Sequence, residues 1–436
     1  MGLGSLALGS LMNRAGAANP LAMRIPQVAG KVKNVIYLHM AGSPPQLDLF
    51  DYKPMLNKLD NKPCPKEFIE GRRLPFIKGH PKLLGSPHTF KQHGQNGQWI
   101  SNMYPMLPGM ADDITFVKSM YTDQFNHAPA QMLLYTGSPR NGSASMGSWI
   151  TYGLGTENQN LPGFVVLCPG KPVVGPALWG NSFLPGIFQG THINNTNIDP
   201  KNAIGHITNK NLSTAAQRRL LDLLQRSNQR HLDKRDVDSN LEARIQSLEM
   251  AFGMQFEAQE AFDTSRETKE TLENYGEGQF ANGCLVARRL VERGVRMVQI
   301  YYGSGQPWDA HGNIMDHKRD AGKSDQPITA LIKDLKQRGL LNETLIVWTG
   351  EFGRTPTAQG KTGRNHHATG FTSWLAGGGI QGGMTYGATD ELGMNAVENR
   401  MDVHDLHATM LHLLGINHEE LTYRYSGRDF RLTDVF

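Results

Sequence analysis

The chain has 436 residues, of which 39% are hydrophobic and 19% charged, and its formal net charge is +4. These values are ordinary for a globular protein and exclude a disordered or fibrous chain. The small net charge, without a run of Lys or Arg, argues against nucleic acid as a partner. The three cysteines lie far apart in the sequence, so they support neither a thiolate metal site nor a disulfide framework.

Residues 1–30 are expected to precede the folded domain. Residues 3–12, LGSLALGSLM, form an apolar stretch too short to span a membrane, and the small residues at 15–18 have the spacing of a cleavage site. We interpret this segment as a truncated export signal of the twin-arginine type, with a disordered tail as the alternative. The first interpretation predicts an exported protein of the periplasm or cell envelope, without a transmembrane segment elsewhere.

The first strong strand signal is Lys33–Met40, KNVIYLHM, an almost unbroken apolar run that ends in Gly and Pro. Such a run is typical of a central strand in a parallel sheet, because both of its faces are covered. Shorter strands are expected at 114–117 and 164–167, with a turn-rich region between them.

Residues 213–275 have a different composition, rich in Arg, Leu, Gln and Glu, with apolar residues at helical spacing. We expect two or three long surface helices here, a helical insertion that serves as scaffold or joins the chain into an oligomer. The alternating pattern then returns. Its elements are expected in the order helix 278–293, strand 295–302, helix 325–338, strand 344–349, strand 371–376 and helix 403–414.

This alternation predicts one α/β domain over residues 31–436, a three-layer sandwich with a mostly parallel central sheet and helices on both faces. Ligands of such sheets bind in the crevice outside the carboxyl ends of the strands. The polar segments that follow the predicted strands are therefore the candidates for a functional site.

Two of these segments carry carboxylates. In WDAHG, Asp309 and His311 are two residues apart, so they could hold one ion, or they could order the loop by a hydrogen bond. In GEFGRTP, Glu351 follows its strand directly, where it could reach a metal ion, and Arg354 is a planar donor suited to an oxyanion. An internal pair between Glu351 and Arg354 is the alternative.

Two further segments supply imidazoles and a hydroxyl. GRNHH contains the adjacent His366 and His367, and neutral His is the commonest metal ligand. The segment after the first strand, AGSPPQLDLFD, offers Ser43 as a nucleophile and Asp48 as a ligand, and NHAPA offers His127 as a further polar candidate. Acids and imidazoles after several strands of one sheet favour a metal site over purely structural roles.

The motifs LHMAGSPPQLDLFDYKP, NHAPAQMLLYTG, WDAHGN, GEFGRTP and GRNHHATGFTSWLAGGGIQGG are long and specific, as is the segment from HDLHATMLHLLGI to the C-terminus. Together they resemble a bacterial family classed as domain of unknown function 1501. The resemblance runs from about residue 31 to the end of the chain. It implies an exported protein, often with a twin-arginine signal.

That family is similar in turn to sulfatases and the alkaline phosphatase superfamily. The resemblance implies a sulfatase-like fold, with one or two divalent ions beside a Ser, Thr or modified Cys nucleophile. By position it implies Asp309 and His311 as ligands, Glu351 in place of an Asp-His pair, and His366 or His367 as a late His.

The first-strand segment departs from the superfamily pattern. Ala41 replaces the usual Asp, and Pro45 stands where related chains have Ser, so the nucleophile is Ser43 or is absent. No Cys has the context of a formylglycine. A site with one metal ion is therefore easier to fill than a site with two.

The sequence thus predicts a metal-dependent hydrolase of phosphate or sulfate esters, acting on a small-molecule or polysaccharide ester. A divalent ion (Zn²⁺, Mn²⁺, Ca²⁺ or Mg²⁺) would polarise the ester oxygen, and Ser43, Arg354 and His127 are the catalytic candidates. The alternative is a non-catalytic binding or scaffold protein of the cell envelope, which Ala41 and Pro45 favour. The predicted metal ligands are Asp48, Asp309, His311, Glu351, His366 and His367.

Overall fold

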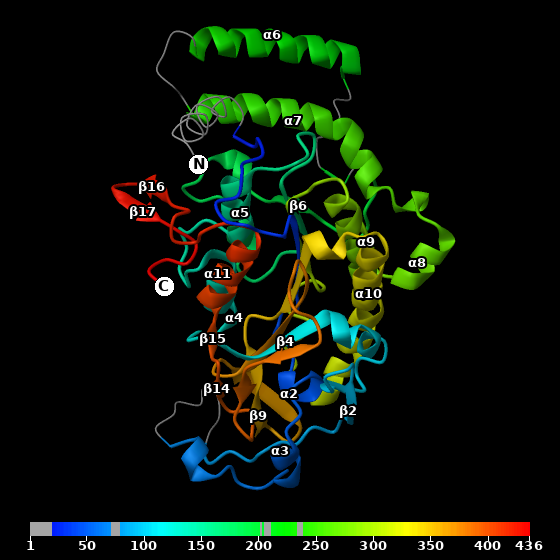
Figure 1. The fold of residues 1–436 in the computed structure, drawn as a ribbon, viewed down its shortest axis with the longest axis vertical. Helices are drawn as coiled ribbons and strands as arrows, with labels where there is room; N and C mark the ends of the chain where they lie inside the picture. Colours follow the sequence, from blue (N-terminus) through cyan, green and yellow to red (C-terminus); the bar gives the residue numbers. More distant parts are fainter. Residues whose placement is uncertain (1–19, 71–78, 201–202, 205–210, 233–238) are drawn as a thin grey trace.

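The protein folds around a mixed sheet whose central strands are parallel (Figure 1). The computed structural model describes residues 20–70, 79–200, 203–204, 211–232 and 239–436. In this part of the chain the strands lie in the order β12-β4-β11-β8-β1-β7-β5-β6, with β15 beside β4. The strands are β1 (Asn34–His39), β4 (Ile114–Tyr121), β5 (Phe164–Leu167), β6 (Thr191–Ile193), β7 (Met297–Tyr301), β8 (Thr344–Thr349), β11 (Phe371–Gly377), β12 (Met384–Tyr386) and β15 (Met401–Asp402).

Strand β1 lies at the centre of the sheet, and all six of its residues are buried. It pairs in parallel with β7 on one side and β8 on the other, as expected for an apolar run covered on both faces. Strands β5 and β6 extend the parallel part beyond β7, whereas β11 runs antiparallel between β8 and β4. The predicted α/β fold with a mostly parallel central sheet is confirmed.

Helices cover both faces of the sheet and complete the three layers. Val35 and Tyr37 of β1 face the core shared with α4, α5 and α11, whereas Ile36 and Leu38 face the core shared with α9 and α10. This alternation follows from the two-residue period of a strand. The helices are α4 (His127–Thr136), α5 (Met146–Leu154), α9 (Gln279–Val291), α10 (His317–Gln337) and α11 (Val403–Leu413).

The segment 213–275, predicted to be a helical insertion, consists largely of helices. Its helices α6 and α7 lie side by side at one end of the molecule, and α6 is the outer of the two (Figure 1). Leu221 of α6 is buried, whereas Leu220 and Leu223 are exposed. Assembly through this insertion stays a prediction. The elements are α6 (Thr214–Leu232), α7 (Ser239–Phe262), η6 (Thr264–Arg266) and α8 (Lys269–Tyr275).

The folded part of the chain includes residues ahead of position 31. Leu21 is buried in the core that α5 and α11 share, and the backbone N–H of Arg24 donates to Leu154 O at 2.9 Å. The expected export signal falls mainly within residues 1–19, which lie outside the described residues, so it stays a prediction.

Two segments have more regular structure than the sequence predicts. The expected turn-rich region between β4 and β5 contains α4 and α5. Helix α4 is buried over most of its length, so it lacks the polar face by which an amphipathic helix is recognised. The expected loops GEFGRTP and GRNHH contribute to an antiparallel pair of strands, β9 (Gly353–Gln359) and β10 (Gly363–His367).

The remaining elements are short and lie around the central layers. Among the described residues, no helix is both long and apolar enough to cross a membrane. The short elements are α2 (Gln46–Leu49), α3 (Pro54–Lys58), η2 (Lys66–Phe68), β2 (Phe90–His93), β3 (Gln98–Ser101), η3 (Leu107–Asp113), η4 (Gly175–Trp179), η5 (Gly186–Phe188), η7 (Ile314–Asp316), η8 (Leu341–Glu343), β13 (Ala388–Thr389), β14 (Ala396–Glu398), β16 (Tyr423–Tyr425) and β17 (Arg428–Phe430).

Candidate metal centre

Three imidazoles surround the carboxylate of Asp309, in the loop that follows β7. Their Nε2 atoms lie 3.3 Å (His127), 2.8 Å (His311) and 3.2 Å (His366) from an oxygen of this carboxylate. His127 is the first residue of α4, His311 shares the loop of Asp309, and His366 lies on β10. For three of the four residues, all but His311, the potential ligand atoms lie within 4.8 Å of one another.

The other nitrogen of each imidazole is held by an oxygen. Because these partners accept hydrogen bonds, each Nδ1 carries a proton and each Nε2 turns a lone pair toward the centre. Oxygen partners on the far nitrogen are typical of metal-bound histidines. The pairs are His127 Nδ1 with Glu351 Oε1 (2.6 Å), His311 Nδ1 with Gln359 Oε1 (2.6 Å) and His366 Nδ1 with Phe125 O (2.8 Å).

The donor set fits a divalent cation. The Nε2 atoms of His311 and His366 lie only 3.0 Å apart, so in this tautomer two lone pairs face each other beside a carboxylate. A cation between these atoms would turn that repulsion into coordination. Imidazole nitrogens with one carboxylate oxygen are a common ligand set for Zn²⁺.

The register of the β9–β10 hairpin selects one of the two adjacent histidines. His366 pairs with Arg354 and its ring reaches Asp309. His367 is the next residue of the strand, so its side chain leaves the opposite face, where its Nε2 lies 3.5 Å from Thr369 Oγ1. The structure therefore brings His366 to the centre and places His367 apart from it.

Glu351 lies behind His127 and not at the centre itself. Its side chain is fully buried and accepts hydrogen bonds from the backbone N–H of Gly42 (3.2 Å) and from Gln131 Nε2 (3.0 Å), in addition to His127. Burial alone would raise the pKa of Glu351, but the hydrogen bond with His127 outweighs burial and lowers the pKa to about 2. Glu351 is therefore an ionised carboxylate that fixes the orientation of His127.

The charged groups of the centre shift one another's pKa values toward the ionised forms. Burial alone would lower the pKa of His127, but its hydrogen bonds with Asp309 and Glu351 outweigh burial and raise the pKa. Burial likewise opposes ionisation of Asp309, yet its histidine contacts and Arg354 hold its pKa far below the usual range. A proton on His127 and a cation at the centre are thus alternative ways to balance the two carboxylates.

Arg354 supports the centre from within the protein. Its side chain is fully buried. Nε donates to Ser43 O at 2.9 Å, and Nη2 donates to Asp309 Oδ1 at 2.7 Å, to Trp308 O at 3.1 Å and to Gly42 O. These bonds tie the loop after β1 to the loop after β7. The expected role of Arg354 at an oxyanion would require exposure that the buried guanidinium lacks.

Ser43 and Asp48 are also buried and contact arginine side chains instead of the histidines of the centre. Ser43 is fully buried, has a left-handed backbone (φ 70°), and gives its carbonyl to Arg354, while its hydroxyl is buried and has no hydrogen-bond partner. The carboxylate of Asp48 forms two hydrogen bonds, of 2.8 and 3.0 Å, with Arg364, and both side chains are fully buried. Asp48 is therefore held by a guanidinium and not by the histidine cluster.

Two groups near the centre, His39 and Gln131, are not among the residues predicted from the sequence. His39, the last residue of β1, has its Nε2 3.6 Å from Glu351 Oε2 and its ring between those of Tyr135 and Tyr301, at 5.2 and 5.1 Å. Burial lowers the pKa of His39 to about 4, which keeps it neutral. Gln131 of α4 donates to Glu351. A polar residue at the carboxyl end of an apolar central strand is the signal by which His39 could have been found.

A family model described as "Protein of unknown function (DUF1501)" matches residues 32–436. The chain belongs to this family. No curated protein matches the DUF1501 chain.

Several solved structures are similar to the DUF1501 chain in fold. The PsFucS1 sulfatase from Pseudoalteromonas sp. is 13% identical, with a TM-score of 0.35, and the match covers 95% of this chain and 72% of that one. A protein in the alkaline phosphatase superfamily from Vibrio parahaemolyticus is 10% identical, with a TM-score of 0.39 and coverage of 95% and 77%. Ps i-CgsB, solved with k-i-k-neocarrahexaose, is 12% identical, with a TM-score of 0.39 and coverage of 88% and 72%. At this level of similarity, the activities of these proteins are not transferred to the DUF1501 chain.

Proposed function

We propose that this DUF1501 protein is an exported, metal-dependent hydrolase of phosphate or sulfate esters with one divalent cation at its centre. The observation that carries the proposal is the set of three imidazoles whose Nδ1 atoms are fixed by oxygens and whose Nε2 atoms converge on Asp309. The ester class rests on the resemblance of the sequence to sulfatases and phosphatases. The donor set favours Zn²⁺.

The residues of the centre divide into ligands and supports. Asp309, His127, His311 and His366 would hold the cation, which would polarise an ester oxygen and acidify a water molecule. Glu351 retains the proton of His127 on Nδ1, and Arg354 fixes Asp309. Because the hydroxyl of Ser43 is buried, we propose water as the attacking group.

The burial of Ser43 and Arg354 favours a second candidate function. Ser43 and Arg354 are both fully buried, so neither offers the centre an exposed hydroxyl or an exposed guanidinium. A metal-binding scaffold protein of the cell envelope would need neither group. Turnover of an ester separates the two candidates.

The test begins with the metal content of the purified protein, measured by elemental analysis. Activity is then measured on 4-nitrophenyl phosphate, bis(4-nitrophenyl) phosphate and 4-nitrophenyl sulfate. We expect one bound cation and hydrolysis of at least one ester by the wild type, and loss of both in the His366→Ala and Asp309→Asn variants. His367→Asn is the matched control, because this neighbouring residue of β10 is directed away from the centre.

Each result has a defined meaning. A protein without metal, or one whose activity survives both ligand substitutions, contradicts the hydrolase proposal. A protein with one bound metal and no turnover of any ester supports the scaffold candidate.

A further inference from the structure

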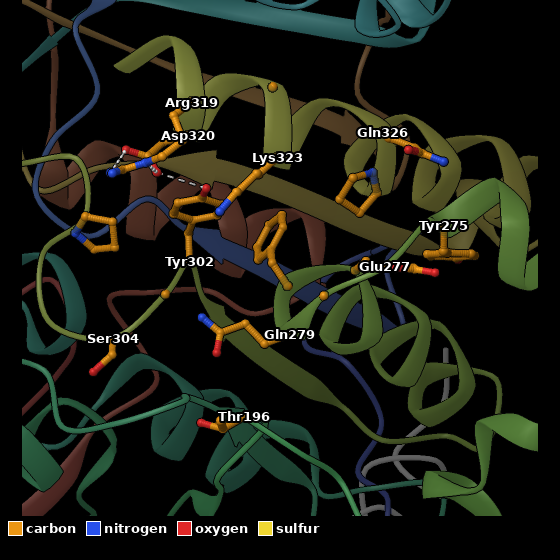
Figure 2. A pocket seen from close by; sticks show the side chains of 17 residues that line it. Thr196, Tyr275, Glu277, Gln279, Tyr302, Ser304, Arg319, Asp320, Lys323 and Gln326 are labelled. Carbon is orange, nitrogen blue, oxygen red and sulfur yellow. Dashed lines mark hydrogen bonds and ion pairs between the residues drawn. The ribbon is translucent and has the colours of Figure 1, made fainter. Parts of the chain in front are cut away.

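A cavity of about 710 Å³ lies beside the loop that carries Asp309 (Figure 2). Its walls are the beginning of α9, the first half of α10 and the residues after β7. Gly303 and Pro307 line the cavity, and the chain continues from Pro307 through buried Trp308 to Asp309. The cavity therefore lies outside the carboxyl end of a central strand, where ligands of α/β sheets bind.

The charged groups of the cavity wall are balanced. Arg319 and Asp320 pair at 2.9 Å, and the hydroxyl of Tyr302 donates to Asp320 at 3.2 Å (Figure 2). The other two charged residues, Lys323 and Glu277, have opposite signs. The wall thus offers no net charge to a ligand.

The rest of the lining mixes polar and aromatic side chains with glycine, alanine and proline. The amide of Gln279 and the hydroxyls of Ser304 and Thr196 line the cavity, while the rings of Phe280 and Tyr302 pack against each other with centroids 5.1 Å apart. Amides and hydroxyls both donate and accept hydrogen bonds. These groups suit a ligand that presents donors and acceptors side by side.

Charge and polarity narrow the class of ligand. An anion would meet Asp320 and Glu277, and a cation would meet Arg319 and Lys323, so neither sign is favoured. An apolar ligand would remove water from these polar groups without replacing the lost hydrogen bonds. A neutral molecule rich in hydroxyl groups satisfies all of them. The volume lies within the usual range for sites of small ligands, about 300–1,000 Å³.

We propose that this cavity binds a neutral sugar chain, the glycan portion of the substrate. The inference rests on the proposed function only for the statement that the bound sugar belongs to the substrate. Binding itself requires no metal and no turnover. The cavity would hold the sugar while the ester reaches the centre around Asp309, two residues further along the chain from Pro307.

A substitution at Gly322 of α10 tests sugar binding most directly, because it can fill part of the cavity. Gly322 lines the cavity, and a Cβ atom at this position would meet no other atom within 4 Å. Gly322→Phe therefore adds a ring to the cavity wall at a position where the Cβ atom itself has free space, and Gly322→Ala is the matched control. Gln279→Ala removes one polar group of the lining, and the side-chain amide of Gln279 makes no hydrogen bond to another described residue.

The probe is an array of neutral oligosaccharides of glucose, galactose, mannose and xylose, with sulfated and carboxylated counterparts. Bound sugars are then titrated by calorimetry against the wild type, the three cavity variants and His366→Ala. We expect the wild type to bind a neutral oligosaccharide, Gly322→Phe to bind it about tenfold more weakly or not at all, and Gly322→Ala and His366→Ala to bind it unchanged. Gln279→Ala should weaken binding about two- to tenfold, the range of one hydrogen bond.

Other outcomes overturn the inference. They are binding to no neutral sugar, binding to charged glycans only, or sugar binding that both Gly322→Phe and Gln279→Ala leave intact. Circular dichroism and metal content verify that the variants are folded. Loss of metal from His366→Ala with sugar binding retained would separate the cavity from the metal centre, so each proposal can fail without the other.

Discussion

The carboxylate of Glu351 is fully buried and is surrounded by the donors of Gly42, Gln131 and His127. A buried anion of this kind is stable only because its neighbours replace the hydrogen bonds of water. In this arrangement Glu351 acts on the centre through the ring of His127. Its charge fixes the proton on Nδ1 and raises the basicity of Nε2, which is the atom that would coordinate a metal.

The Glu351→Gln variant tests this role. It keeps the size of the side chain and removes its charge, so His127 remains in place with a less basic Nε2. We expect the affinity for Zn²⁺ to fall about 10- to 100-fold, the usual effect of losing an outer partner of a ligating histidine. Competition with a chelating dye measures this change. Glu343→Gln, on the surface beside Lys33, is the matched control, and equal affinities of both variants would exclude the role of Glu351.

For Asp48 we predict an effect on stability and none on metal binding. Its pair with Arg364 is fully buried, and removal of one partner of a buried pair costs about 3–5 kcal/mol, since the other charge is left without compensation. We expect Asp48→Asn to lower the free energy of unfolding by this order and to keep one metal ion per folded protein. Denaturant titration and elemental analysis measure the two quantities. Loss of the metal from a folded Asp48→Asn protein would restore Asp48 to the ligands.

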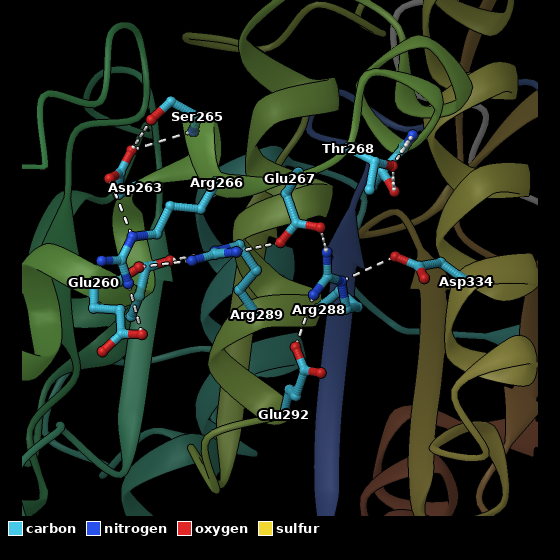
Figure 3. A network of polar contacts seen from close by, with 12 residues as sticks. Glu260, Asp263, Ser265, Arg266, Glu267, Thr268, Arg288, Arg289, Glu292 and Asp334 are labelled. Atoms are coloured by element: carbon cyan, nitrogen blue, oxygen red, sulfur yellow. Dashed lines mark hydrogen bonds and ion pairs between the residues drawn. The ribbon is translucent and has the colours of Figure 1, made fainter.

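At the scale of elements, the helical insertion is joined to the sheet-covering helices by a network of ion pairs (Figure 3). Glu267, between η6 and α8, contacts both Arg288 (2.6 Å) and Arg289 of α9, and Arg288 also reaches Asp334 of α10 at 2.9 Å. The side chain of Arg288 is only 1% exposed. The network therefore fixes the end of the insertion against two core helices.

This network predicts a loss of stability in acid. Burial alone would raise the pKa of Glu267, but the hydrogen bonds of Arg288 and Arg289 outweigh burial and lower the pKa below its ordinary value of 4.5. Because the pKa is lower in the folded state, the stabilisation is complete above pH 4.5 and is lost as the pH falls through the folded-state pKa. We expect Glu267→Gln to unfold at a lower temperature than the wild type at pH 7, with a difference that narrows below pH 4.5.

Thermal unfolding of both proteins between pH 3 and pH 7 measures the difference. Glu273→Gln is the matched control, because its pair with Lys269 is exposed and such pairs contribute at most about 1 kcal/mol. A difference between wild type and Glu267→Gln that is constant over the whole pH range would contradict the prediction.

The strands of the centre were predicted where their burial is visible in the sequence. NVIYLH and TLIVWT are continuous apolar runs, and they form β1 and β8 at nearly the expected positions. The hairpin β9–β10 was not predicted, because its strands contain Arg, Asn, His and Gln, which are typical of exposed loops. In the structure the polar atoms of these residues form hydrogen bonds inside the protein. Helix α4 was missed for the opposite reason, since its burial removes the polar face.

The residues of the site could likewise be predicted only in part from the sequence. The spacing of Asp309 and His311 and the pair His366-His367 marked the segments of the centre, but only the three-dimensional pairing shows which side chains meet. The register of β10 decides between His366 and His367. The partner Arg364 of Asp48 is remote in sequence, so no local pattern could assign that carboxylate to an ion pair.

At the scale of the whole molecule, the centre joins segments from distant parts of the chain. His127 begins a helix on one face of the sheet, Asp309 follows a central strand, and His366 lies on a hairpin outside the sheet. A cation bound to all three would therefore add a connection between elements that hydrogen bonds and an ion pair already join. An ion that binds the folded state and not the unfolded chain stabilises the folded state.

This coupling predicts that metal removal lowers the stability of the entire domain. After dialysis against a chelator, added Zn²⁺ at about 100 times its dissociation constant should stabilise the protein by about 2.7 kcal/mol and raise the unfolding temperature with increasing concentration. Scanning calorimetry measures the shift, with Mg²⁺ as the comparison ion, because Mg²⁺ prefers oxygen ligands and should produce little change. His366→Ala should unfold at the same temperature with and without Zn²⁺, whereas His367→Asn should respond like the wild type. A Zn²⁺-induced shift of equal size in His366→Ala would place the ion elsewhere, because the connection between helix, loop and hairpin depends on this ligand.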